Sequence, residues 1–99
     1  RFDLLVTPAV PITAFETGRE VPRDWPSTRW PTWTPFTYPF NMTGQPALSV
    51  PCGFSASGLP IGLQIVGARF EDKKVLQAGH AYQQVAPLTD QRPSLFDQA

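Results

Sequence analysis

Few side chains in this sequence could act as nucleophiles or bases. The 99 residues include one cysteine, Cys52, and one histidine, His80. A thiol and an imidazole form a catalytic pair only where the imidazole lies within hydrogen-bonding reach of the sulfur. Cys52 ends a predicted strand, where small thiols are commonly buried, and His80 falls in the middle of a predicted helix. These positions favour structural roles for both residues over a catalytic dyad.

The serines and lysines also lack the context that catalysis requires. Lys73 and Lys74 stand beside acidic residues at the start of a predicted helix. A lysine that acts as a base needs burial, whereas lysines in a charged first turn are solvated. The Gly-x-Ser-x-Gly turn that exposes a nucleophile in many hydrolases does not surround any of the candidate serines, which are Ser49, Ser55, Ser57 and Ser94. Solvated lysines and serines in turns are therefore the favoured interpretation.

The composition argues against metal, cofactor and nucleic-acid binding. A cysteine-based zinc cluster needs several cysteines, and the acidic residues are scattered without the spacing of a calcium loop. The glycines form neither a phosphate-binding loop nor a dinucleotide-binding motif. Eight acidic and eight basic residues give a net charge of zero, so no basic field attracts a phosphate backbone. We expect no metal, no cofactor and no direct nucleic-acid partner.

Three further features bear on the setting of the chain. No apolar run approaches the roughly 18 residues of a membrane-spanning helix, so we expect no membrane partner. A single cysteine fits a reducing compartment, which predicts a cytoplasmic location. Proline accounts for 12 of the 99 residues, whereas ordinary domains contain about 5% proline. Charged residues make up 16% of the chain, compared with about 25% in ordinary domains. We expect this chain, which begins without methionine, to be a piece of a larger protein that covers part of its surface.

The elements that would position these side chains alternate between strands and helices. Residues 3–7 predict a strand, and their continuous Leu-Leu-Val run is typical of a strand covered on both faces. Residues 36–44 predict a short helix, with Pro35 or Pro39 in its first turn and Gly44 at its end. Residues 47–52 and 61–66 predict an antiparallel hairpin with a turn around 57–58.

The last predicted helix covers residues 71–86. Asp72 is a candidate for its cap, and Pro87 would end it. The helical spacing predicts a buried stripe on one side of this helix, formed by Val75, Gly79, Tyr82 and Ala86. Leu76 would widen this stripe.

The remaining residues predict an arm and a tail. Residues 8–35 hold six prolines and three tryptophans without a sustained period, and we expect an extended arm that lies across another surface. Residues 88–99 predict a surface strap or a partly disordered tail.

Three blocks of the sequence resemble the amidase signature family. Residues 40–53 read FNMTGQPALSVPCG, and residues 58–67 read GLPIGLQIVG. Both are similar to the C-terminal region of that family, and residues 3–8, DLLVTP, are similar to the strand that precedes it. The order and spacing of the blocks agree with the family over nearly the whole chain.

The resemblance implies an α/β fold, in which a mixed β-sheet is flanked by helices. Family members are hydrolases or amidotransferases that use a Ser–cis-Ser–Lys triad. The triad lies upstream in relatives, and neither Lys73 nor Lys74 matches its lysine, so the resemblance implies a fragment without catalytic residues. It also implies that residues 1–99 form a single fragment of an amidase domain, whose strands join the central sheet. Four residues fall where relatives line the substrate, namely Trp33, Thr34, Tyr38 and Phe70.

Our leading hypothesis is therefore the C-terminal fragment of an amide-bond hydrolase that is inactive when isolated. Its partners would be the missing N-terminal catalytic part of the same chain and a small amide substrate, with a homo-oligomer also open. Two alternatives remain at this stage. One is a fragment of the glutaminase-type subunit of a tRNA-dependent amidotransferase. The other is a non-enzymatic binding module that uses the tryptophans of the arm.

Overall fold

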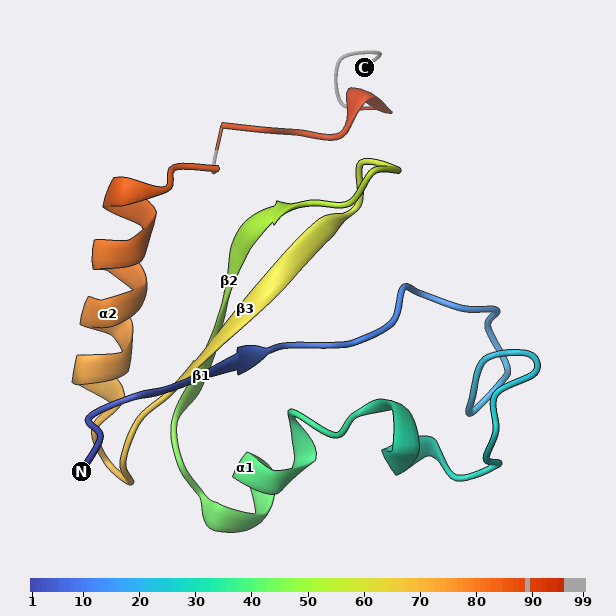
Figure 1. The fold of residues 1–99 in the computed structure, drawn as a ribbon, viewed down its shortest axis with the longest axis horizontal. Helices are drawn as coiled ribbons and strands as arrows, with labels where there is room; N and C mark the ends of the chain where they lie inside the picture. Colours follow the sequence, from blue (N-terminus) through green and yellow to red (C-terminus); the bar gives the residue numbers. More distant parts are fainter. Residues whose placement is uncertain (89, 96–99) are drawn as a thin grey trace.

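A computed structural model describes residues 1–88 and 90–95. Two helices, a 3-10 helix and three strands follow one another along the chain (Figure 1). In order they are β1 (Leu5–Pro8), η1 (Trp30–Trp33), α1 (Tyr38–Thr43), β2 (Ala47–Phe54), β3 (Pro60–Val66) and α2 (Asp72–Val85). The predicted order of strand, arm, short helix, hairpin and helix is confirmed, and η1 is an additional turn inside the arm.

The three strands form one antiparallel sheet in the order β1-β3-β2. The predicted hairpin of β2 and β3 is confirmed, with Phe54 opposite Pro60 next to its turn. The central strand β3 also pairs with β1, so that Leu5 lies opposite Val66. Every pairing in the described part of the chain is antiparallel. Any parallel pairing of the mixed sheet that the family implies therefore involves strands other than these three.

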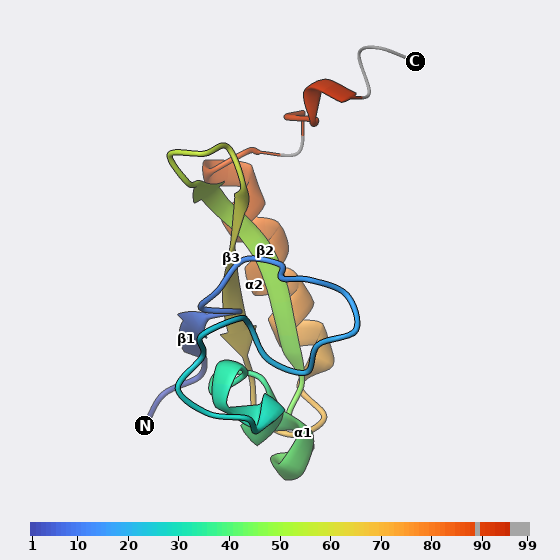
Figure 2. The ribbon, with the colours of Figure 1, turned by 90° about the vertical axis from the view of Figure 1, so that its right-hand side faces the viewer.

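Helix α2 covers one face of the hairpin and forms the core with it. Val75 of α2 packs with Val50 of β2 and Ile65 of β3, and all three side chains are buried. The 8–35 arm extends away on the opposite side of the sheet, as Figure 1 and the perpendicular view in Figure 2 both show. The sheet is therefore the middle layer between α2 and the arm.

The boundaries of α2 differ slightly from the prediction. The helix begins at Asp72, and the residue before it, Glu71, takes the cap position without a side-chain cap bond. The prediction that Asp72 caps the helix is therefore wrong. The Glu71 N–H donates to the Ala68 carbonyl, and this turn places Glu71, not Asp72, at the cap position. Asp72 lies instead in the first turn, where the helix dipole favours an acidic side chain.

The predicted stripe of α2 is mostly confirmed. Val75 and Gly79 are buried, and Tyr82 and Ala86 are half-buried. Leu76 does not widen the stripe, since its side chain is exposed. It follows Val75 by one residue, and consecutive helical side chains point about 100° apart, so Leu76 turns away from the sheet.

Strand β1 is less covered than the sequence predicts. Leu5 and Val6 are each more than half exposed in this chain, so burial on both faces is wrong for the described structure. The physical reason is its place at the edge of the sheet, next to β3 alone. Helix α2 packs on β2 and β3 and leaves β1 without a covering layer.

The short helix α1 ends where the sequence predicts. Gly44 follows its last residue with φ of 68°, a left-handed conformation that glycine adopts without steric cost. The Gly44 N–H donates to the Phe40 carbonyl at 3.0 Å. Pro39, and not Pro35, lies in the first turn. Of the predicted tail, residues 89 and 96–99 lie outside the described part of the chain.

Candidate functional site

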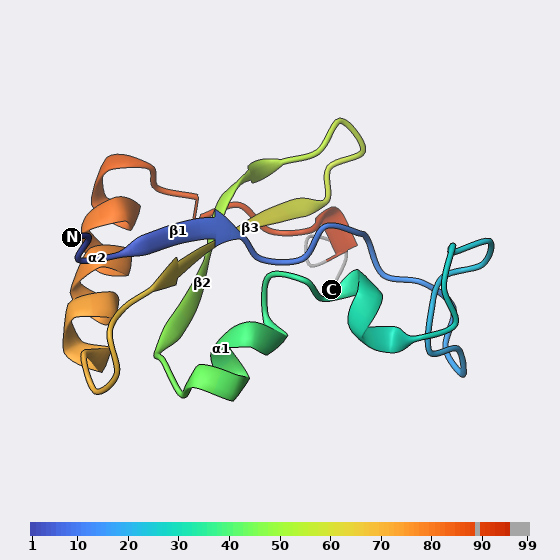
Figure 3. The same ribbon diagram turned by 60° about the horizontal axis from the view of Figure 1, so that its bottom comes forward.

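The four predicted substrate residues come from two connections of the fold. Trp33 ends η1, Thr34 follows it and Tyr38 begins α1, while Phe70 belongs to the connection from β3 to α2. Figure 3 shows the chain running from the arm through η1 and α1 to the start of β2.

A tight turn over residues 34–38 sets the position of Tyr38. Thr34 is buried, and its carbonyl accepts the Thr37 N–H at 3.3 Å and the Tyr38 N–H at 3.5 Å. The Thr34 hydroxyl donates to the Pro31 carbonyl at 3.3 Å. Thr34 therefore stabilises the turn through its carbonyl, and its hydroxyl is already hydrogen-bonded to Pro31.

Tyr38 lines a shallow surface hollow of about 370 Å³ together with Arg29, Pro31, Thr32 and Pro35. Its side chain is 38% exposed, so the phenol is accessible. Proline rings form apolar walls, while the phenol and the Arg29 guanidinium are the polar groups that could orient a ligand. No ion pair involves Arg29 within residues 1–88 and 90–95. Arg29 was not predicted from the sequence, because it is one of three arginines in the arm and nothing in its spacing distinguishes it from Arg19 and Arg23.

Trp33 faces the arm and not this hollow. Its ring meets the Phe15 ring edge to face, with centroids 5.3 Å apart. The indole N–H donates to the Glu20 carbonyl at 2.9 Å. The Trp25 indole likewise donates to the Thr32 hydroxyl at 2.8 Å. Two of the three indoles therefore hold the arm together, which weakens the hypothesis that the arm is a ligand platform.

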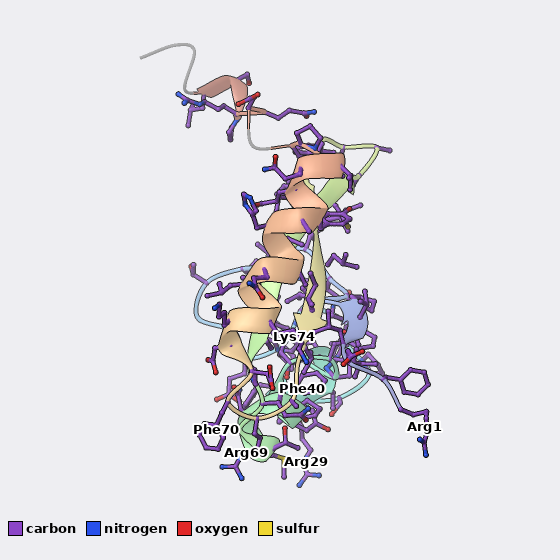
Figure 4. All side chains as sticks on the ribbon, turned by 90° about the vertical axis from the view of Figure 1, so that its left-hand side faces the viewer. Arg1, Arg29, Phe40, Arg69, Phe70 and Lys74 are labelled. Carbon is purple, nitrogen blue, oxygen red and sulfur yellow. The ribbon has the colours of Figure 1, made fainter. Side chains whose placement is uncertain are left out.

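Phe70 is strongly exposed in a strained connection. Its side chain is 86% exposed, and its φ is 67°. The Arg69 guanidinium lies 5.3 Å from the centre of the Phe70 ring. Figure 4 shows both side chains together at the lower end of the molecule, away from most of α2. Arg69 also lies beside Gly44 at the end of α1, so this connection borders the short helix.

The residues that could act as nucleophiles do not converge in the described structure. Cys52 lies at the register shift of β2 between Pro51 and Gly53, and it is partly buried. His80 lies on the exposed side of α2. Within the residues that the structure describes, no hydrogen bond joins them, and no group of three or more His, Cys, Asp or Glu side chains could hold a metal. None of the described helices is both long and apolar enough to span a bilayer.

The sequence profile of the amidase family matches residues 1–76, which hold all three strands and the predicted substrate residues. This chain belongs to the amidase family. The resemblance drawn from the three sequence blocks is thereby confirmed.

Comparisons with individual proteins agree with the family match. The A subunit of glutamyl-tRNA(Gln) amidotransferase from Brevibacillus brevis is 46% identical over 92 residues, which make up 93% of this chain and 18% of that protein. The structure of 6-aminohexanoate cyclic dimer hydrolase superposes with a TM-score of 0.76 at 34% identity, covering 96% of this chain and 22% of that one.

A second solved structure is the A subunit of glutamyl-tRNA(Gln) amidotransferase from Thermotoga maritima. It has a TM-score of 0.70 and 42% identity over 87% of this chain and 18% of that one. The predicted α/β fold is confirmed by these neighbours. The chain spans about a fifth of the length of the relatives it matches.

Proposed function

We propose that this chain is the C-terminal segment of an amidase that hydrolyses carbon–nitrogen amide bonds. The family match over residues 1–76 carries the proposal, together with the likeness to a solved hydrolase at a TM-score of 0.76. The segment would supply β1, β2 and β3 to a larger sheet and one wall of the substrate pocket. Its partner would be the N-terminal part of the same protein, which in this family holds the catalytic serines and lysine.

The exposed apolar side chains support a larger assembly. The uncovered face of β1 and the 86% exposed Phe70 are surfaces that soluble proteins bury against other layers. A small core of Val50, Ile65 and Val75 holds the segment together, and the rest of its apolar residues would pack on the catalytic part. The low fraction of charged residues fits the same role.

The pocket wall would be formed by the hollow beside Tyr38. The proline walls fit an apolar acyl chain, and the phenol could donate a hydrogen bond to a polar group at its end. Phe70 would contribute from the second connection. Thr34 and Trp33 would act behind this wall, since their polar hydrogens already bond within the arm and its turn.

The decisive experiment compares the full-length protein with the isolated 99 residues. Both are incubated with a series of simple aliphatic amides, and released ammonia is measured against a mock preparation. We expect hydrolysis by the full-length protein and none by the isolated segment. Hydrolysis by the segment alone would show that the catalytic groups lie in these 99 residues, contrary to the proposal. A full-length protein that cleaves no amide would contradict the hydrolase assignment.

A second candidate function is the glutaminase step of a tRNA-dependent amidotransferase. It is favoured by the 46% identity to a relative that is named as the A subunit of glutamyl-tRNA(Gln) amidotransferase. A protein of this kind would hydrolyse glutamine and depend on a second protein, whereas a free amidase would accept simple amides alone. Ammonia release from an aliphatic amide with no other protein added would indicate a free amidase, whereas ammonia release from glutamine that requires the second protein would indicate the glutaminase function.

A further inference from the structure

Gln64 is a buried polar residue in the middle of the central strand. Its exposed fraction is 5%, and Thr34 is the other buried polar side chain of the described residues. Burying a carboxamide costs free energy unless its polar atoms find hydrogen-bond partners. An apolar residue would fit a buried strand position without that cost, so the partners of Gln64 indicate what it does.

The carboxamide of Gln64 joins β3 to two other parts of the chain. Its Nε2 donates to the Thr7 hydroxyl at 2.9 Å and to the Phe36 carbonyl at 2.6 Å. Thr7 is its register partner on β1, and Ser49 is its register partner on β2. The flanking residue Ile65 belongs to the core under α2, so Gln64 points to the opposite face, because successive strand residues alternate.

Phe36 lies at the centre of the 34–38 turn, two residues from Thr34 and two from Tyr38. The backbone hydrogen bonds of this turn join it only to residues 31–40, which are its neighbours along the chain. Among the hydrogen bonds of residues 1–88 and 90–95, the bond from Gln64 to Phe36 is the one that joins the turn to the sheet. The position of Tyr38 relative to β3 therefore depends on this bond.

We propose that Gln64 is a positioning residue for substrate selection. It holds the 34–38 turn on the sheet, and through that turn it fixes the Tyr38 phenol at the pocket wall. The expected effect of Gln64 on substrate selection rests on the proposed function, whereas its anchoring of the turn is independent of that function. Glutamine suits the task because its side chain reaches both partners and carries two N–H donors, whereas a carboxylate would have none.

The test uses the full-length protein with Gln64→Met, which keeps the length of the side chain and removes both donors. Thr7→Val is the matched control, because it removes the other hydrogen bond of Gln64 and leaves the bond to Phe36 in place. Hydrogen exchange of the peptide that covers residues 34–38 should be about tenfold faster in Gln64→Met than in Thr7→Val. The ratio of kcat/KM between long and short acyl amides should change several-fold in Gln64→Met alone.

The coupling to Tyr38 gives the second readout. With Tyr38→Ala already present, Gln64→Met should no longer change the ratio, because it acts through the missing side chain. Unchanged exchange at 34–38, an unchanged ratio or an additive double variant would each overturn the inference. A wild-type protein without amidase activity would instead refute the proposed function, and the exchange experiment would still decide whether Gln64 anchors the turn. Gln64→Asn, whose carboxamide is one methylene too short to reach Phe36, replaces Gln64→Met if that variant does not fold.

Discussion

Gly79 of α2 lies directly over Leu48 of β2, with no room between them for a side chain. A methyl group on Gly79 would overlap the Leu48 Cδ2 atom and also touch Val50. Glycine is unfavourable inside a helix, yet here it lets the helix backbone approach the sheet closely. The close approach of α2 to β2 at this point thus depends on the absence of a side chain at Gly79.

This contact predicts that Gly79→Ala destabilises the protein. Alanine at an exposed helical position would stabilise by about 0.5–1 kcal/mol. Here we expect the free energy of unfolding to fall by about 1 kcal/mol, because the added methyl displaces the Leu48 side chain, which packs against the core. Chemical denaturation of the full-length protein measures the change. Gln77→Ala, on the exposed side of α2, is the control and should be nearly neutral, and a more stable Gly79→Ala would contradict the close contact.

The indole of Trp33 predicts a change in protease sensitivity of the arm. Trp33→Phe keeps an aromatic ring against Phe15 and removes the N–H that donates to Glu20. Loss of one such bond costs about 1 kcal/mol, so trypsin cleavage after Arg19 and Arg23 should become roughly fivefold faster. Trp30→Phe is the control, since the described structure gives the Trp30 indole no hydrogen bond. Equal cleavage of the two variants would mean that Trp33 does not order the arm.

Removal of the Tyr38 side chain should change substrate preference more than stability. Tyr38→Ala widens the hollow beside Arg29, so kcat/KM for long acyl amides should change about tenfold relative to short ones. The free energy of unfolding should fall by less than about 1 kcal/mol, because the side chain is partly exposed. Met42→Ala, on the same short helix but outside the hollow, should leave the preference unchanged. Unaltered relative kcat/KM across chain lengths in Tyr38→Ala would remove Tyr38 from the pocket.

Phe70 combines a strained backbone with an exposed ring, and two variants separate these properties. Phe70→Gly removes both the ring and the strain of a φ of 67°, while Phe70→Ala removes the ring alone. We expect Phe70→Gly to be about 1 kcal/mol more stable than Phe70→Ala. If the ring lines the pocket, both variants should raise the KM for acyl amides above the wild-type value by the same factor. An unchanged KM in both would place Phe70 outside the substrate channel.

The hairpin and α2 were predictable because their packing follows a period. Residues of β2 and β3 alternate between two faces, and Val75 and Gly79 recur at helical spacing, so burial could be predicted from the sequence. The exposure of β1 could not be predicted in this way. A continuous apolar run indicates that a strand is covered, but not that the covering layer belongs to the same chain.

The candidate site was predictable only in part. Tyr38 lines a hollow, but Trp33 packs into the arm, because its indole finds a carbonyl 13 residues away that no periodic pattern connects to it. Arg29 and Gln64 were not identified at all. The role of Gln64 depends on the backbone carbonyl of Phe36, and a backbone acceptor leaves no trace in the sequence of side chains.

The pairing of β1 with β3 has a consequence for chain entropy. Thr7 and Gln64 are 57 residues apart, so β1 joins a hairpin that can form locally before it. The entropy of closing such a loop grows only with the logarithm of its length, and doubling the length adds about 0.6 kcal/mol. The arm between β1 and α1 could therefore lengthen or shorten considerably at little thermodynamic cost. The sheet would keep its register while the wall that the arm builds beside Tyr38 took a different shape.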